Sequence, residues 1–167
     1  MPIDIGGVPT HPLVVHVPVV LVPLALIMVI AYFFARPWRR PLAWIAGVVS
    51  GGGALGAVLA ADSGESLQHR VKESSALRDH AQMGETARLL AVIFFVVVVV
   101  LVVFEEVRSR RVDDQSPSGT MSAIVSHRVA YPVMAVLLVI SGGVAVASLV
   151  SAGHAGAKVT WENVGPP

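Results

Sequence analysis

Four long apolar runs constrain what this chain can fold into. Crossing roughly 30 Å of hydrocarbon takes about 20 helical residues, and the runs are long enough to do so. The third contains IFFVVVVVLVVF; valine favours strands, but a lone strand cannot satisfy its backbone polar groups in lipid, so a helix is expected. The sequence therefore predicts an all-α, integral membrane four-helix bundle. Its spans are expected at about 13–35, 42–61, 87–104 and 129–151.

The basic residues predict the orientation of this bundle. The connector RPWRRP carries three arginines and no acid, and a second arginine-rich loop is expected over 105–128. The polar loop expected over 62–86 has its bases balanced by acids. The positive-inside rule then places the arginine-rich loops in the cytoplasm and both termini outside the cell. Residues 1–167 are expected to form a single multi-pass domain of the cell membrane, and MPIDIGGVPT, which lacks a basic residue, is not expected to be a signal peptide.

Composition excludes several classes of function. The chain is 54% hydrophobic, its mean hydropathy is +0.73 and its net charge is +1, so nucleic acid is not an expected partner. It has no cysteine, so a disulfide, a thiolate zinc site, an iron–sulfur cluster or c-type haem attachment is excluded. No phosphate loop, HExxH motif or Ser–His–Asp order is present. An electron carrier or accessory subunit is therefore expected rather than a stand-alone enzyme.

Five of the six histidines fall at the same predicted end of the bundle. His11 and His16 open the first span, His69 and His80 lie between the second and third, and His154 follows the fourth. Ionisable side chains near a membrane interior are functional candidates by default, and imidazole is a common metal ligand. The clustering predicts a cofactor or metal site at this end.

On two of the predicted helices, small residues lie on the same face as the histidine. At helical spacing, the residues along the His80 face are Gly84, Ala87 and Ala91, and those along the His154 face are Ser151, Ala147 and Gly143. The second span adds Gly52, Gly56, Ala60 and Ser63. Such faces either leave room for a flat group such as a porphyrin or close directly onto neighbouring helices. The Gly47/Gly51 and Gly52/Gly56 pairs also have the GxxxG spacing of close helix packing.

The leading hypothesis is a membrane-embedded b-type haem protein that transfers electrons at its extracytoplasmic face. His16 and His80 are the first choice of axial ligands, because spans one and three are diagonal in a sequential bundle. His11 and His154 are candidates for a second pair or for a site of another metal. Arg78 and Arg70 are candidate partners of haem propionates. The expected partners are the lipid bilayer and a redox or respiratory membrane complex.

Two alternatives remain open. In the first, the chain is a cofactor-free accessory or structural subunit whose glycine-rich faces dock against partner helices or another copy. In the second, the histidines and carboxylates hold Cu, Zn or Fe. No Glu-x-x-His pair of the di-iron type is present. Asp62, Glu65 and Glu85 are expected at helix ends or in ion pairs with Arg70, Arg78 and Arg88.

The opening HPLVVHVPVVL resembles the HP-x-x-VHFPI motif of a bacterial membrane family, domain of unknown function 2231, with Val17 in place of the usual Phe. The likeness extends to an acidic residue after an Ala/Gly-rich second span, a histidine before span three, and a closing element in which His154 and Gly156 match R-H-G-x-x-V with Ala155 inserted. The resemblance implies four spans. Some relatives resemble fusions to cytochrome c-type domains, which implies redox work at the outer face.

Overall fold

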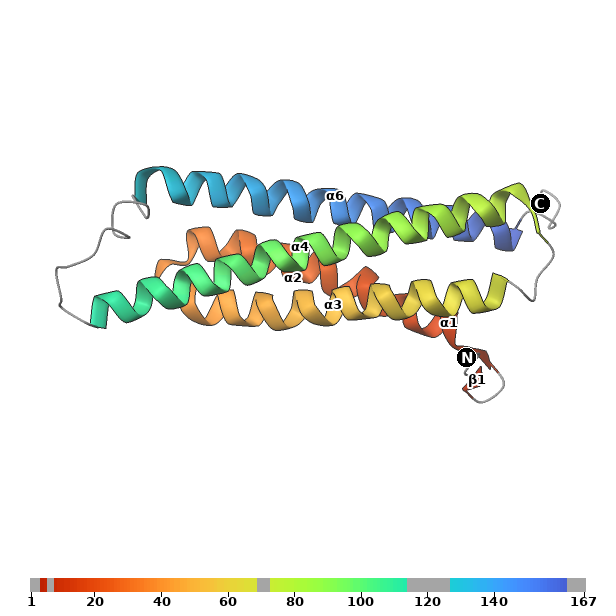
Figure 1. Cartoon of the computed structure of the whole chain (residues 1–167), viewed down its shortest axis with the longest axis horizontal. Helices are drawn as coiled ribbons and strands as arrows, with labels where there is room; N and C mark the ends of the chain where they lie inside the picture. Colours follow the sequence, from red (N-terminus) through yellow and green to blue (C-terminus); the bar gives the residue numbers. More distant parts are fainter. Residues whose placement is uncertain (1–3, 6–7, 69–72, 114–126, 162–167) are drawn as a thin grey trace.

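The chain forms an elongated bundle of four long helices in a computed structural model (Figure 1). The structure describes residues 4–5, 8–68, 73–113 and 127–161, and their side chains over 10–68, 73–110 and 130–161. The elements in chain order are β1 (Asp4–Ile5), β2 (Val8–Pro9), α1 (Thr10–Val14), α2 (His16–Phe34), η1 (Arg36–Trp38), α3 (Arg39–Gln68), α4 (Ser75–Asp113) and α6 (His127–Trp161). β1 and β2 pair antiparallel as a small hairpin.

The first span is broken near its start, between α1 and α2. Val15 separates the two helices, and Pro18 follows three residues later. Proline has no backbone N–H, so the carbonyl of Val14 lacks the i+4 donor that a continuous helix would supply. Pro23 lies inside α2 without ending it. The first span is therefore interrupted just before Pro18, which leaves α1 as a separate short helix.

Buried residues repeat at alternating steps of three and four along the helices. In α2 they are Pro18, Val22, Ala25, Val29 and Tyr32. In α4 they include Ala87, Ala91, Phe94, Val98 and Leu101, and in α6 Leu138, Ala145, Leu149 and Ala152. This is the seven-residue period of knobs-into-holes packing in helix bundles. The opposite faces expose large apolar side chains such as Val96 and Val100, as expected for helices that face lipid.

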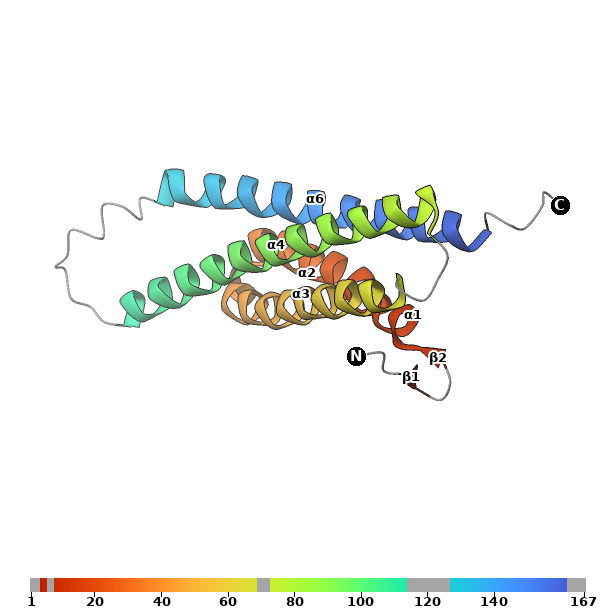
Figure 2. The same cartoon turned by 45° about the vertical axis from the view of Figure 1, so that its right-hand side comes forward.

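The helices are arranged in sequence order around the bundle. α3 packs between α2 and α4, α6 packs on α4, and α2 closes the ring against α6. α2 and α4 are therefore diagonal, as the sequence predicted for spans one and three. Figure 2, turned by 45°, shows the same order.

Glycines of α3 allow its neighbours to approach closely. A Cβ on Gly56 would lie 2.6 Å from Cγ1 of Val17, and one on Gly51 would lie 3.1 Å from a ring carbon of Phe95. α2 thus packs on one side of α3 and α4 on the other. The close packing predicted from the GxxxG spacings is confirmed.

Within the described residues, four helices are long and apolar enough to cross a membrane, which confirms the predicted fold class. The helices extend beyond the predicted spans, because polar residues at their ends remain helical. α3 continues to Gln68, and α4 begins at Ser75, where the Ser74 hydroxyl accepts a hydrogen bond from the backbone N–H of Leu77 (3.1 Å). Much of the predicted loop over 62–86 is therefore helix. The side of the membrane on which each end lies remains a prediction.

Candidate functional site

The histidine end of the bundle, named for His11, His80 and His154, is where α1, α3, α4 and α6 meet (Figure 1). Two of these histidines form a pair. The ring centroids of His11 on α1 and His80 on α4 lie 6.1 Å apart, with 78° between the ring planes. Both rings are half-buried. The pair joins the two diagonal segments of the bundle, the first span and the third.

The backbone of α3 anchors the His11 ring. Nδ1 of His11 lies 2.8 Å from the carbonyl oxygen of Ala60 and 3.3 Å from Oγ of Ser63. The ring also rests against Gly64, where a Cβ would lie only 2.9 Å from Cε1 of His11. A side chain at this position would therefore displace the ring.

His80 is held in the same way by α6. Its Nδ1 lies 3.0 Å from the carbonyl oxygen of Ala152. Its ring rests against Gly156, where a Cβ would lie 2.9 Å from Cε1 of His80. Each imidazole thus has one carbonyl partner and one glycine contact on a neighbouring helix.

These anchors determine the tautomer of both rings. A carbonyl oxygen can only accept, so Nδ1 of each histidine carries the proton and donates it. In the neutral ring, Nε2 then keeps its lone pair. Metal-ligating histidines commonly use this arrangement, in which the second nitrogen donates to a carbonyl and fixes the ring orientation. His11 and His80 could therefore hold a metal through Nε2.

The structure pairs His80 with His11 and not with His16, which was the first choice from the sequence. His16 is exposed on α2, and His154 is exposed on α6. Helical geometry accounts for the difference, because five residues turn a helix by about 140° from the starting face, and the break at Val15 separates the two histidines further. His11 therefore points into the bundle while His16 points outward.

The three small-residue faces do not line one common pocket. In α3, Gly52 and Gly56 are filled by Leu21 and Val17 of α2. The α6 face turns outward, with Gly143, Ala147 and Ser151 exposed. On α4, Ala87 and Ala91 are buried in the core, whereas Gly84 has open space beside it. Most of these residues therefore serve helix packing or face outward, and a cofactor pocket at this end stays a prediction.

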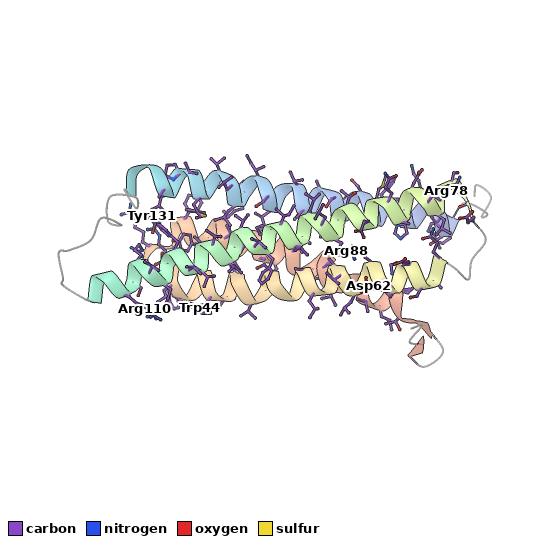
Figure 3. The ribbon with its side chains drawn as sticks, in the orientation of Figure 1. Trp44, Asp62, Arg78, Arg88, Arg110 and Tyr131 are labelled. Atoms are coloured by element: carbon purple, nitrogen blue, oxygen red, sulfur yellow. The ribbon has the colours of Figure 1, made fainter. Side chains whose placement is uncertain are left out.

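The described arginines near the histidine pair form ion pairs with carboxylates. Arg88 bonds to Glu85 one turn away and to Asp62 of α3 at 3.5 Å, and Figure 3 shows Arg88 and Asp62 on neighbouring helices. These pairs confirm the expected partners of Arg88. Arg78 is exposed and lies 4.0 Å from Glu73. The other predicted propionate partner, Arg70, lies outside the residues that the structure describes.

A groove of about 360 Å³ lies between α4 and α6 near this end of the bundle. It is lined by Asp79, Gln82, Met83 and Thr86 of α4 and by Ser148 and Ser151 of α6. Within the described part of the chain, no three histidine, aspartate or glutamate side chains gather into a metal-ligating group.

The opposite, arginine end of the bundle (Arg36, Arg39, Arg40, Arg108 and Arg110) contains a buried polar network that the sequence interpretation missed. The Tyr32 hydroxyl donates to Oε2 of Glu105 at 2.7 Å. Tyr32 is fully buried and Glu105 is 2% exposed. Arg108 bonds to both carboxylate oxygens of Glu105, so the buried charge is paired.

Two further residues extend this network to all four helices. Tyr131 of α6 lies 3.4 Å from the Tyr32 hydroxyl. Arg39 of α3 donates to the Tyr131 hydroxyl at 3.4 Å, and its guanidinium lies 4.8 Å from the centroid of the Tyr131 ring. The predicted third span stopped at Phe104, so Glu105 was assigned to a loop. Its position directly after the apolar run, three residues before Arg108, was the signal that could have identified it.

Comparison with protein families identifies the group to which this architecture belongs. A family model matches residues 7–165, nearly the whole chain. The chain belongs to the family domain of unknown function 2231. The family is described as a predicted membrane protein, which agrees with the four membrane-length helices. No curated protein and no solved structure matches the chain.

The membership in domain of unknown function 2231 confirms the resemblance inferred from the opening motif. Within that motif, His11 and Pro12 lie in α1, directly after its first residue, and His11 is the histidine that packs against His80. In the closing element, Gly156 contacts the His80 ring. The opening motif and the closing element therefore each contribute a residue that packs against His80.

Proposed function

We propose that this protein is a membrane-embedded electron carrier that binds b-type haem through His11 and His80. The observation that carries the proposal is the paired geometry of the two imidazoles, each with Nδ1 bonded to a carbonyl oxygen. His80 keeps the role expected from the sequence, and His11 replaces His16.

The donor set fits haem iron. Metal–imidazole nitrogen bonds are about 2 Å long, so two imidazoles on opposite sides of one metal atom have ring centres roughly 6 Å apart. The measured centroid separation is 6.1 Å. His11 and His80 would hold the iron of a haem through their Nε2 atoms, and the porphyrin would supply its remaining ligands. Gly84, one turn from His80, has open space beside it that would leave room for a flat group near the pair.

The bound haem would supply reversible one-electron chemistry, with its potential set by the axial ligands and their hydrogen bonds. The residues of this chain would position it. The carbonyls of Ala60 and Ala152 orient the two rings, and the exposed Arg78 is available to a propionate. We further propose that the histidine end faces the outside of the cell membrane, where a redox or respiratory partner exchanges electrons.

The test is the absorption spectrum of the full chain, purified in detergent from cells supplied with haem, before and after dithionite. A Soret band with sharp α and β bands on reduction, at about one haem per chain, is expected for two axial imidazoles. A spectrum without these bands, recorded on correctly folded protein from haem-supplied cells, would contradict the proposal. Stoichiometric copper, zinc or iron without haem would favour the metal-handling alternative, in which His11 and His80 bind a free ion.

A second candidate function is a cofactor-free accessory subunit. It is favoured by the outward small face of α6, where Gly143, Ala147 and Ser151 are exposed. Small residues at four-residue spacing allow close helix association in membranes. This candidate predicts a colourless protein that is purified together with a partner chain or as an oligomer.

A further inference from the structure

The corner between α2 and α3, at the arginine end, carries two arginines on one side of a tight turn. η1 spans Arg36–Trp38, and α3 begins at Arg39. In a 3₁₀ turn, side chains three residues apart eclipse each other. Arg36 and Arg39, three residues apart, are therefore expected on the same side of the turn, where an anion would reduce the repulsion between their like charges.

These two arginines differ from the other described arginines of this end. Arg40 and Arg110 both bond to Glu106, and Arg108 bonds to Glu105. Arg39 instead contacts the carbonyl oxygens of Tyr32 and Phe33, each at 3.4 Å, and the two tyrosines. Arg36 is exposed, and among the described residues neither it nor Arg39 has a carboxylate partner. The corner thus has guanidinium donors in excess of its acceptors.

Exposed aromatic residues surround the same corner. Phe34 is 82%, Trp38 65% and Trp44 52% exposed, and Figure 3 shows Trp44 at this end of α3. Tryptophan is enriched where a membrane protein crosses the lipid–water interface. The two arginines therefore lie at the depth at which lipid headgroups surround the bundle.

We propose that Arg36 and Arg39 form a binding site for the headgroup phosphate of an anionic phospholipid. Guanidinium groups bind phosphate oxygens with two parallel N–H bonds. The contacts of Arg39 with backbone carbonyls and tyrosine rings hold its guanidinium in place, and Arg36 closes on the phosphate from the same side. The exposed Phe34 and Trp38 contact the glycerol and upper acyl region. This site is independent of the haem proposal, because it lies at the opposite end of the bundle.

The test compares the retention of phosphatidylglycerol and phosphatidylcholine by the full chain in native mass spectrometry. One charge-assisted hydrogen-bond pair contributes about a factor of ten in affinity. We therefore expect Arg36→Gln to weaken phosphatidylglycerol binding about tenfold. Arg110→Gln is the matched control, since it removes an exposed arginine of the same end that already bonds to Glu106, and it is expected to change binding little.

Three results would overturn this proposal. Equal retention of both lipids would exclude a specific headgroup site. An equal loss of phosphatidylglycerol binding in Arg36→Gln and Arg110→Gln would indicate only general charge attraction. Displacement of the lipid by millimolar inorganic phosphate would identify a soluble anion as the ligand. If Arg36→Gln fails to fold, quenching of tryptophan fluorescence in the unchanged chain serves instead, with brominated phosphatidylglycerol expected to quench more than brominated phosphatidylcholine.

Discussion

At the residue scale, two glycines position the histidine pair together with its hydrogen bonds. Gly64 and Gly156 each leave room for an imidazole where a methyl group would collide with it. Gly153, three residues before Gly156 on α6, has nothing within 4 Å of its Cβ position. Gly153 and Gly156 therefore form a matched pair for testing whether the position of the His80 ring contributes to stability.

Gly156→Ala is expected to destabilise the chain by about 1–3 kcal/mol, because the new methyl group forces the His80 ring away from Ala152. Gly153→Ala is expected to be neutral or stabilising by up to about 1 kcal/mol, since alanine favours helix over glycine. Thermal unfolding in detergent measures both. Equal effects of the two substitutions would show that the His80 ring does not depend on Gly156.

The buried network at the arginine end makes a second residue-scale prediction. Tyr32→Phe removes the hydroxyl that donates to Glu105 at 2.7 Å and leaves the buried carboxylate with one partner fewer. The expected cost is about 1–3 kcal/mol of unfolding free energy. Asp79→Asn, which changes an exposed carboxylate of the same helix as Glu105, is the control and should leave stability unchanged. A Tyr32→Phe protein as stable as the control would mean that the network contributes little.

At the element scale, the contact between α2 and α3 depends on side-chain size in α3. A Cβ on Gly56 would lie 2.6 Å from Val17 and 3.0 Å from Cδ of Pro18, so Gly56→Ala must push the helices apart. The expected loss is about 1–3 kcal/mol. Gly143→Ala on the outward face of α6 is the control. If Gly56→Ala and Gly143→Ala changed the thermal unfolding temperature equally, the observed α2–α3 packing would be contradicted.

The sequence was most informative about these elements. Apolar length predicted the four helices, and the GxxxG spacings predicted the close packing of α3. It could not tell whether a stripe of small residues faces a neighbour, lipid or a cofactor, because that depends on how each helix is rotated in the bundle. Gly143 and Ala147 thus share a face in sequence as Gly52 and Gly56 do, yet one face is exposed and the other is filled.

The candidate site was partly predictable for the same reason. The histidine-rich end and the diagonal relation of spans one and three follow from helix order, so a contact between His80 and the first span could be predicted. The choice between His11 and His16 depended on the break at Val15 and on the phase of α1, which hydrophobic pattern alone does not define. Glu105 was missed because a charged residue just beyond an apolar run normally marks the end of a membrane span.

At the scale of the whole molecule, the bundle has an apolar middle and a different polar cluster at each end. The histidine pair ties α1 to α3, α4 and α6, and the Tyr32–Glu105 network ties all four long helices together. Buried polar groups persist in such positions only when they are bonded to one another. The molecule therefore has a paired-imidazole cluster at one end and a bonded Tyr–Glu–Arg network at the other.

The most direct test of the account is the haem content of four variants: His11→Ala, His80→Ala, His16→Ala and His154→Ala. Each is purified from haem-supplied cells, and the Soret absorbance per folded chain is compared with that of the unchanged protein. Loss of haem in the first two and its retention in the last two is the predicted result. Retention in all four, or loss with His16→Ala but not with His11→Ala, would contradict the assignment of His11 and His80 as the ligand pair.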